Sequence, residues 1–217
     1  MDVQFYSFQP SAMTNSMEIL EIRTLRGPNY WSGYWKKLII MRLDIGDYEE
    51  KPTNKIDGFY GRMMEVLPSL FSHGCSYGEE GGFLKRVEEG TWAGHAIEHF
   101  ALEMQTLAGM DTGYGRTRET DEKGIYNVVY SYLEEEVGRF AGRTAVRLWL
   151  DLAEGKDLAE IKEGIAKAIQ EMREIRENVR FGPSTGSLVE EADHRDIPFI
   201  RLNDQSLVQL GYGVYQK

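Results

Sequence analysis

The sequence predicts an α+β fold in which an antiparallel sheet is packed with helices. Two runs rich in strand-forming residues, 17–26 and 37–44, flank a connection that contains a Gly-Pro-Asn turn, as in an antiparallel pair. A second pair, 113–120 and 124–133, is again separated by a short polar turn. Between and beyond these pairs, apolar residues recur every three or four positions, which is the period of a helix lying on a core.

The predicted strands differ in character. The run 17–26 mixes Ile19 and Leu25 with charged residues, whereas 37–44 is almost continuously apolar (KLIIMRLD). The run 124–133 is rich in tyrosine and valine, two residue types favoured in strands. We expect all four runs to join one sheet.

The predicted helices follow in order along the chain. The segment 58–71 carries an apolar stripe, and 91–107 has the clearest helical period and ends before Gly109. A third helix over 134–152 opens with three glutamates, which favour the positive end of a helix dipole. A polar helix over 158–179 has alternating charges that are typical of a solvated face.

The chain divides into four parts. Residues 1–16 show no periodicity and are expected to form an N-terminal extension. The sheet and its helices define a domain over 17–156, followed by a connecting helix over 157–181. The last segment, 182–217, has the pattern of a turn, a helix and a strand that follows a proline, which is a short βα segment.

Composition excludes several classes of protein. The 217 residues include 25 basic and 35 acidic side chains, a formal net charge of −10 that disfavours nucleic acid as a partner. No stretch approaches the roughly 20 apolar residues that a membrane helix needs, and no secretory signal precedes the first strand. A single cysteine, Cys75, rules out an internal disulfide framework and fits the reducing cytoplasm.

The most specific motif is H-x-x-E-H, formed by His95, Glu98 and His99. On a helix these residues share one face, so both imidazoles can bind one metal ion and the glutamate can serve as a general base. A catalytic zinc needs a third protein ligand, which the glutamates at 134–136 could supply. The alternative is that both histidines are buried helix residues hydrogen-bonded to Glu98 and its neighbours.

Three further features are weaker candidates. Cys75 and His73 could form a nucleophilic pair, although they lie in a glycine-rich turn. That turn lacks the GK[ST] ending of a phosphate-binding loop, so we expect no ATP site in these residues. Arg116 and Arg118 alternate on a predicted strand and could grip a carboxylate, or could simply be exposed.

Several segments of the chain together have a familiar pattern. They are LRGPNYW (25–31), LIIMRLD (38–44), GHAIEHFALEMQTLAGM (94–110), GYGRTRET (113–120) and EEVGRFAGRTAVRL (135–148). Together they resemble the N-terminal region of the cyanophycin synthetase family, in the family's order, and the resemblance covers 17–217, with 1–16 outside it. The final segment, with GPSTGSLVEEA and SLVQLGYGVYQK, is similar to the lead-in to the ATP-grasp domain of these enzymes.

The resemblance implies a function that involves cyanophycin, multi-L-arginyl-poly-L-aspartate. Complete enzymes extend this polymer with an ATP-grasp domain and a Mur-ligase-like domain, which are the implied partners, and neither body is present in these residues. The N-terminal domain holds the polymer, and in some members a metal-dependent site cuts it into primers. By resemblance, His95 and His99 with Glu135 or Glu136 would bind zinc, and Glu98 would be catalytic.

Three functions therefore stay open. The chain is a metallohydrolase domain, a non-catalytic module that anchors the polymer for the ligase domains, or an assembly module of a larger homo-oligomer. The polymer carries a guanidinium and a carboxylate in every repeat, so acidic side chains together with Arg116 and Arg118 would suit it.

Overall fold

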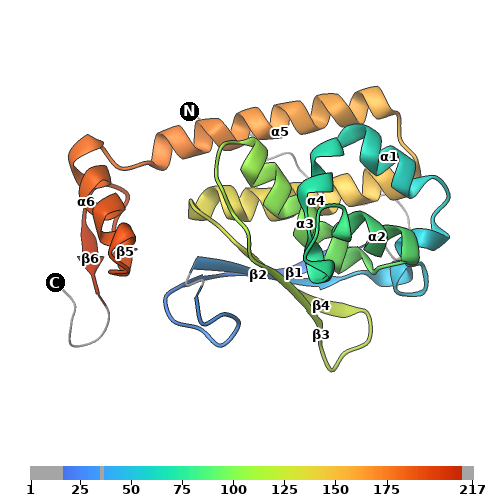
Figure 1. Cartoon of the computed structure of the whole chain (residues 1–217), viewed down its shortest axis with the longest axis horizontal. Coiled ribbons are helices and arrows are strands. Elements are labelled where there is room, and N and C mark those ends of the chain that lie inside the picture. Colours follow the sequence, from blue (N-terminus) through green and yellow to red (C-terminus); the bar gives the residue numbers. More distant parts are fainter. Residues whose placement is uncertain (1–16, 35–36, 212–217) are drawn as a thin grey trace.

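The computed structural model describes residues 17–34 and 37–211, and the predicted extension 1–16 lies outside them. The α+β prediction is confirmed. All four predicted strands form one antiparallel sheet in the order β1-β2-β4-β3, with helices gathered over one face (Figure 1). The strands are β1 (Glu18–Arg26), β2 (Lys37–Asp44), β3 (Gly115–Glu119) and β4 (Ile125–Ser131).

Strand β2 is apolar because it is buried on both faces. Ile39 and Met41 point into the main core beneath the helices, and Leu38 and Ile40 pack on the opposite face beside Trp31. Since β2 pairs with β1 on one side and β4 on the other, its backbone groups are satisfied within the sheet.

The helices cover the sheet in two layers. They are α1 (Phe59–Val66), α2 (Gly82–Glu89), α3 (Ala93–Leu107), α4 (Glu135–Glu154) and α5 (Leu158–Val179). Two short 3₁₀ turns lie between β2 and α1, η1 (Gly46–Glu50) and η2 (Thr53–Lys55), and two more lie between α1 and α2, η3 (Pro68–Ser72) and η4 (Cys75–Tyr77). Helix α3 lies directly on β3 and β4, as expected for the helix that carries His95.

Two helices differ from the prediction. The segment predicted as one helix over 58–71 ends at Val66, because Leu67 precedes Pro68 and is forced out of helical geometry. Helix α2 lies outside the helices that the sequence predicts. It is only eight residues long and begins at Gly82, the second of two adjacent glycines, so its apolar period is too short to be distinctive.

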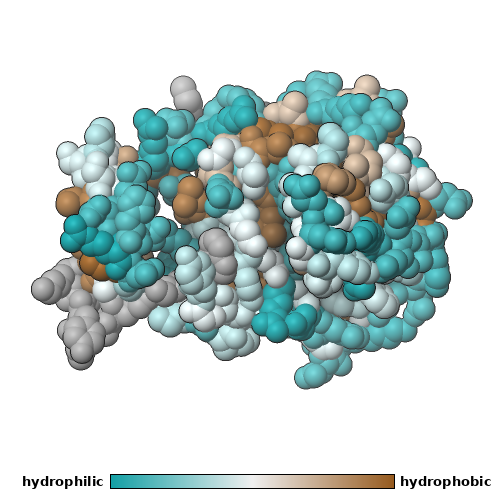
Figure 2. Space-filling model, in the orientation of Figure 1, coloured by the Kyte–Doolittle hydropathy of each residue, from teal (hydrophilic) through white to brown (hydrophobic). Residues whose placement is uncertain are grey.

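Helix α5 packs against the main core rather than bridging open space. Its inward residues are Ile161, Ile165, Ala168 and Met172, all buried. Figure 2 shows the outer side of this region as mostly hydrophilic, with apolar residues gathered beneath it. Arg173 and Arg176 donate hydrogen bonds to the carbonyls of Leu107 and Gly109 at the C-terminal end of α3. Helix α5 therefore supplies the donors that this end of α3 requires.

The final described segment forms a small unit apart from the main sheet, at the left of Figure 1. It consists of α6 (Pro183–His194) and a two-stranded antiparallel sheet of β5 (Phe199–Arg201) and β6 (Val208–Leu210). Leu188 and Leu207 are more than half exposed there. Among the described residues, none of the helices has both the length and the apolar character needed to cross a membrane.

Candidate functional site

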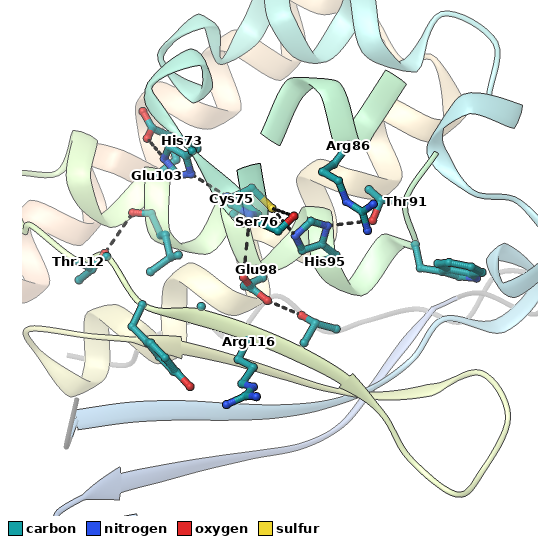
Figure 3. A pocket seen from close by; sticks show the side chains of 18 of the residues that line it. His73, Cys75, Ser76, Arg86, Thr91, His95, Glu98, Glu103, Thr112 and Arg116 are labelled. Atoms are coloured by element: carbon teal, nitrogen blue, oxygen red, sulfur yellow. Dashed lines mark hydrogen bonds and ion pairs between the residues drawn. The ribbon is translucent and has the colours of Figure 1, made fainter. Parts of the chain in front are cut away.

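A cavity of about 900 Å³ lies between α3, β3 and the η4 turn. Figure 3 shows side chains from all three elements pointing into it or standing at its rim. Its lining mixes polar and apolar surface and includes three arginines, four acidic residues and three of the four histidines of the chain. A cavity of this size in which several polar groups converge is typical of a ligand site.

Three potential metal ligands meet in this cavity. His95 and His99 lie one turn apart on α3, and Cys75 reaches them from η4. Their ligand atoms all lie within 4.8 Å of one another, and Cys75 Sγ is 3.3 Å from His95 Nε2. The backbone of Cys75 has a φ of +49°, a left-handed conformation that is uncommon outside glycine and often occurs at functional sites.

The position of Cys75 is fixed by close packing of the loop before α2. A Cβ atom on Gly82 would lie 2.0 Å from the carbonyl oxygen of Gly74, so only a glycine at the start of α2 allows the loop to fold back this far. The three donors match zinc, which binds cysteine sulfur and histidine nitrogen. Ligand atoms around a tetrahedral zinc of this kind are roughly 3.3–3.7 Å apart, close to the sulfur–nitrogen distance observed here.

Hydrogen bonds hold the far side of each imidazole. Thr91 Oγ1 lies 2.9 Å from His95 Nδ1, and His73 Nδ1 lies 2.8 Å from His99 Nδ1. Phe83 stacks on the His99 ring with centroids 4.0 Å apart. The Nε2 atoms of His95 and His99 therefore face the cavity.

Burial keeps both imidazoles in the form that binds metals. It lowers the pKa of His95 to about 4, with a further contribution from the positive charge of Arg86. Burial also holds the pKa of His99 well below its ordinary value, and the neighbouring His95 and His73 act in the same direction. Both rings are therefore neutral at pH 7, and a neutral imidazole offers a free lone pair.

Glu98 is a buried carboxylic acid beside these ligands. Its Oε2 accepts a hydrogen bond of 2.6 Å from Thr117 Oγ1 on β3, and its Oε1 lies 4.0 Å from His99 Nε2. A Cβ atom on Gly115 would come within 2.2 Å of Oε1, so the space for the carboxylate depends on that glycine. Burial raises the pKa of Glu98 to about 8, although the Thr117 hydrogen bond acts against this.

The glutamates predicted as the third ligand lie elsewhere. Glu135 forms a bidentate ion pair with Arg26 at 2.5 and 2.7 Å. Neither Glu135 nor Glu136 lines the cavity. The structure thus brings together His95, Glu98 and His99 from the prediction, and it places Cys75 beside both histidines.

Arg116 and Arg118 both line the cavity and point the same way, as alternation along β3 predicts. Thr117 between them faces Glu98, so the two arginines extend from the other face of the strand. Arg116 Nη1 lies 3.4 Å from the carbonyl of Trp31. Figure 3 shows Arg116 at the rim of the cavity, away from Cys75 and His95.

The sequence pattern does not reveal the contacts of Cys75, His73 and Glu103. It suggests Cys75 and His73 only as a nucleophilic pair, whereas in the structure Cys75 contacts His95 and His73 contacts His99. Glu103 lies one turn beyond His99 on α3, and its carboxylate is 2.7 Å from His73 Nε2. The available signal was the number of histidines: three of only four lie within 27 positions of each other, from 73 to 99.

Comparison with known proteins agrees with the predicted resemblance. The model of the cyanophycin synthase-like N-terminal domain matches residues 40–154. The chain is 53% identical over 201 residues to a cyanophycin synthetase from Synechocystis sp. and 52% identical to one from Crocosphaera subtropica. In both cases the match covers 93% of this chain and 23% of the relative, so the chain spans about a quarter of their length. The chain therefore belongs to the family of cyanophycin synthase-like N-terminal domains.

Proposed function

We propose that this chain binds cyanophycin and hydrolyses its peptide backbone at a zinc centre formed by Cys75, His95 and His99. The observation that carries the proposal is the convergence of these three donors beside the buried carboxyl group of Glu98. A site with three protein ligands leaves one position open, which is the arrangement of catalytic zinc.

The chain's own residues provide the remaining chemistry. When bound, zinc would polarise the scissile carbonyl and make water a better nucleophile. Glu98 would accept a proton from the attacking water as its oxygen bonds to the carbonyl carbon. It would then deliver that proton to the amide nitrogen as the carbon–nitrogen bond breaks. A nearby cation lowers the pKa of a carboxyl group, so zinc would bring that of Glu98 down from about 8.

The charges of the cavity support cyanophycin as the substrate. Each repeat of the polymer carries one guanidinium and one carboxylate. Asp111 and Glu119 line the cavity and could pair with guanidinium groups, while Arg116 and Arg118 at the rim could bind carboxylates. The names of the relatives identify synthetases of this polymer.

The position of Glu135 supports Cys75 as the third ligand. The carboxylate of Glu135 forms an ion pair with Arg26, whose guanidinium is 2.5 Å away. A carboxylate would have to leave this ion pair to reach α3, whereas Cys75 Sγ already lies 3.3 Å from His95 Nε2. We therefore infer that Cys75 replaces the predicted glutamate.

The lengths of the relatives support the proposal that this activity takes place beside ligase domains. We infer that residues 182–217 form the lead-in segment of an ATP-grasp domain, since the matched relatives are synthetases about four times as long as the matched region. The exposed side chains of Leu188 and Leu207 would then be covered by the rest of that domain. New polymer ends made by the zinc centre would serve the ligase domains as primers.

The decisive test incubates the purified chain with cyanophycin and follows new amino termini. Wild type should produce them, a chelator should stop the reaction, and added zinc should restore it. Glu98→Gln should keep zinc but lose on the order of 10²-fold or more in rate, because an amide cannot accept the proton. The matched control is Glu136→Gln, which should cleave like wild type.

Each alternative has its own outcome. A zinc-free wild-type chain that binds polymer without cutting it would establish the anchoring module instead. Loss of zinc in Glu136→Gln, with zinc retained in Cys75→Ser, would return the third ligand to the glutamates of α4. Cleavage by Glu98→Gln at the wild-type rate would remove Glu98 from the reaction.

A further inference from the structure

We propose that His73 and Glu103 are positioning residues that fix His99 in the tautomer whose Nε2 is free to bind metal. This inference rests on the proposed zinc centre and assigns roles to two residues outside its ligand set. It concerns a chain of hydrogen bonds that runs from Glu103 through His73 to His99. Glu103 and His73 lie at the upper left of Figure 3.

The chain begins at a fully buried carboxylate. Glu103 is 2% exposed. One of its oxygens accepts a hydrogen bond from Ser69 Oγ, and the other lies 2.7 Å from His73 Nε2. Burial alone would raise the pKa of Glu103, but the hydrogen bonds from His73 and Ser69 hold it below its ordinary value. An ionised carboxylate can only accept, so Nε2 of His73 must carry the proton.

The next link is decided by counting protons. In the proposed arrangement His73 is a neutral imidazole with one N–H, which Nε2 donates to Glu103, and this leaves Nδ1 as an acceptor. His73 Nδ1 lies 2.8 Å from His99 Nδ1, and a hydrogen bond between two nitrogens needs one proton. The proton therefore belongs to Nδ1 of His99, and Nε2 of His99 carries a lone pair.

That lone pair is aimed at the ligand cluster. His99 Nε2 lies on the side of Glu98, 4.0 Å from its Oε1, and the His99 ring is nearly perpendicular to that of His95. In the opposite tautomer Nε2 would carry a hydrogen and could not bind a cation. Partners of this kind fix ring orientation and basicity at metal sites, and their loss typically costs 10–100-fold in affinity.

The test uses a matched pair of substitutions at His73. Asparagine places its side-chain oxygen close to the position of Nδ1 and can accept from His99, whereas leucine has nearly the same shape and cannot. The affinity for zinc is measured by competition with a chromophoric chelator on the full chain. His73→Leu should weaken zinc binding by roughly 10–100-fold, and His73→Asn should stay within about threefold of wild type.

A second measurement reads the tautomer directly. Nitrogen NMR of the metal-free wild-type chain should show His99 protonated at Nδ1 and unprotonated at Nε2. The opposite assignment would overturn the proposal even if His73→Leu failed to fold. Equal zinc affinities for His73→Leu and His73→Asn would also overturn it, because a purely structural role does not depend on an acceptor.

The outcomes separate this inference from the proposed function. A wild-type chain that binds zinc but never cuts the polymer would reject the hydrolase, while the His73 pair would still decide the positioning role. If the wild-type chain cuts the polymer and the His73→Leu variant binds zinc as tightly as the wild type, only the positioning role is rejected. A wild-type chain without affinity for zinc would overturn both.

Discussion

Helices α3 and α5 both pack on the same core, yet they are buried in different ways. Helix α5 has one apolar stripe, and its other faces are charged and exposed. Helix α3 is buried almost all the way round, and its buried side chains include the polar Glu98, His99, Glu103 and Gln105. Burying polar groups costs free energy unless they find partners. An apolar α3 would be the simpler way to build the same core, so its polar residues point to function.

The largest expected effect comes from breaking the polar side of α3. His95→Ala removes one of the three proposed ligands and should lower zinc affinity by roughly 10³-fold or more, which corresponds to about 4 kcal/mol. Activity should disappear with the metal. Zinc content after dialysis measures this loss, and wild-type zinc content in the variant would exclude His95 from the centre.

A substitution on the apolar side of α5 should instead lower the stability of the fold and leave zinc affinity unchanged. Met172 is fully buried, so Met172→Ala should destabilise the fold by about 2–5 kcal/mol in urea unfolding. Zinc affinity of the folded fraction should be unchanged. The exposed neighbour Glu171→Ala is the control and should shift stability by less than about 0.5 kcal/mol. A large change in zinc affinity for Met172→Ala would mean that the two helices are not separable.

The pH dependence of stability sharpens the comparison. In the metal-free fold the pKa of Glu98 is about 8, above the value of about 4.3 expected in an unfolded chain. Between these two values the folded state binds more protons, so this residue makes the fold less stable as pH rises. Glu98→Gln removes the effect and should be more stable than wild type by roughly 2–4 kcal/mol at pH 8.

The two proteins should differ much less at pH 5, where Glu98 is protonated in the folded state. Both proteins retain His95 and His99, so the contribution of these residues to pH dependence cancels in the difference between their unfolding free energies. Urea unfolding of the two metal-free proteins at pH 5 and pH 8 measures this difference. A difference that did not grow with pH would show that Glu98 ionises freely in the fold.

The smallest effect concerns charges outside both helices. Arg116 and Arg118 are exposed at the rim of the cavity. Their joint replacement by alanine should weaken polymer binding by less than about tenfold at low salt, and high salt should remove the difference. Arg147→Ala on α4 is the control, since it is exposed and does not line the cavity. Equal polymer affinity of the double variant and wild type at low salt would exclude both arginines.

Local sequence pattern predicted the sheet and α3 because their periods are long and regular. It could not predict α2, where eight residues follow several glycines. The H-x-x-E-H group was accessible because a helix brings residues three and four positions apart together. The contacts of Cys75 and His73 with α3 could not be predicted from the sequence, since they depend on how the loop before α2 folds. The glutamates of α4 had suitable chemistry, but the path of the chain puts Glu135 beside Arg26.

The hydrogen bonds from α5 to the end of α3 bear on how a working fragment should be cut from a longer synthetase. The family model stops at 154, before α5 begins at Leu158. A protein ended there would lose Arg173 and Arg176, leave the carbonyls of Leu107 and Gly109 without these donors, and expose the core that α5 covers. The shortest excised unit that keeps α3 covered and its C-terminal carbonyls bonded should therefore extend through Val179.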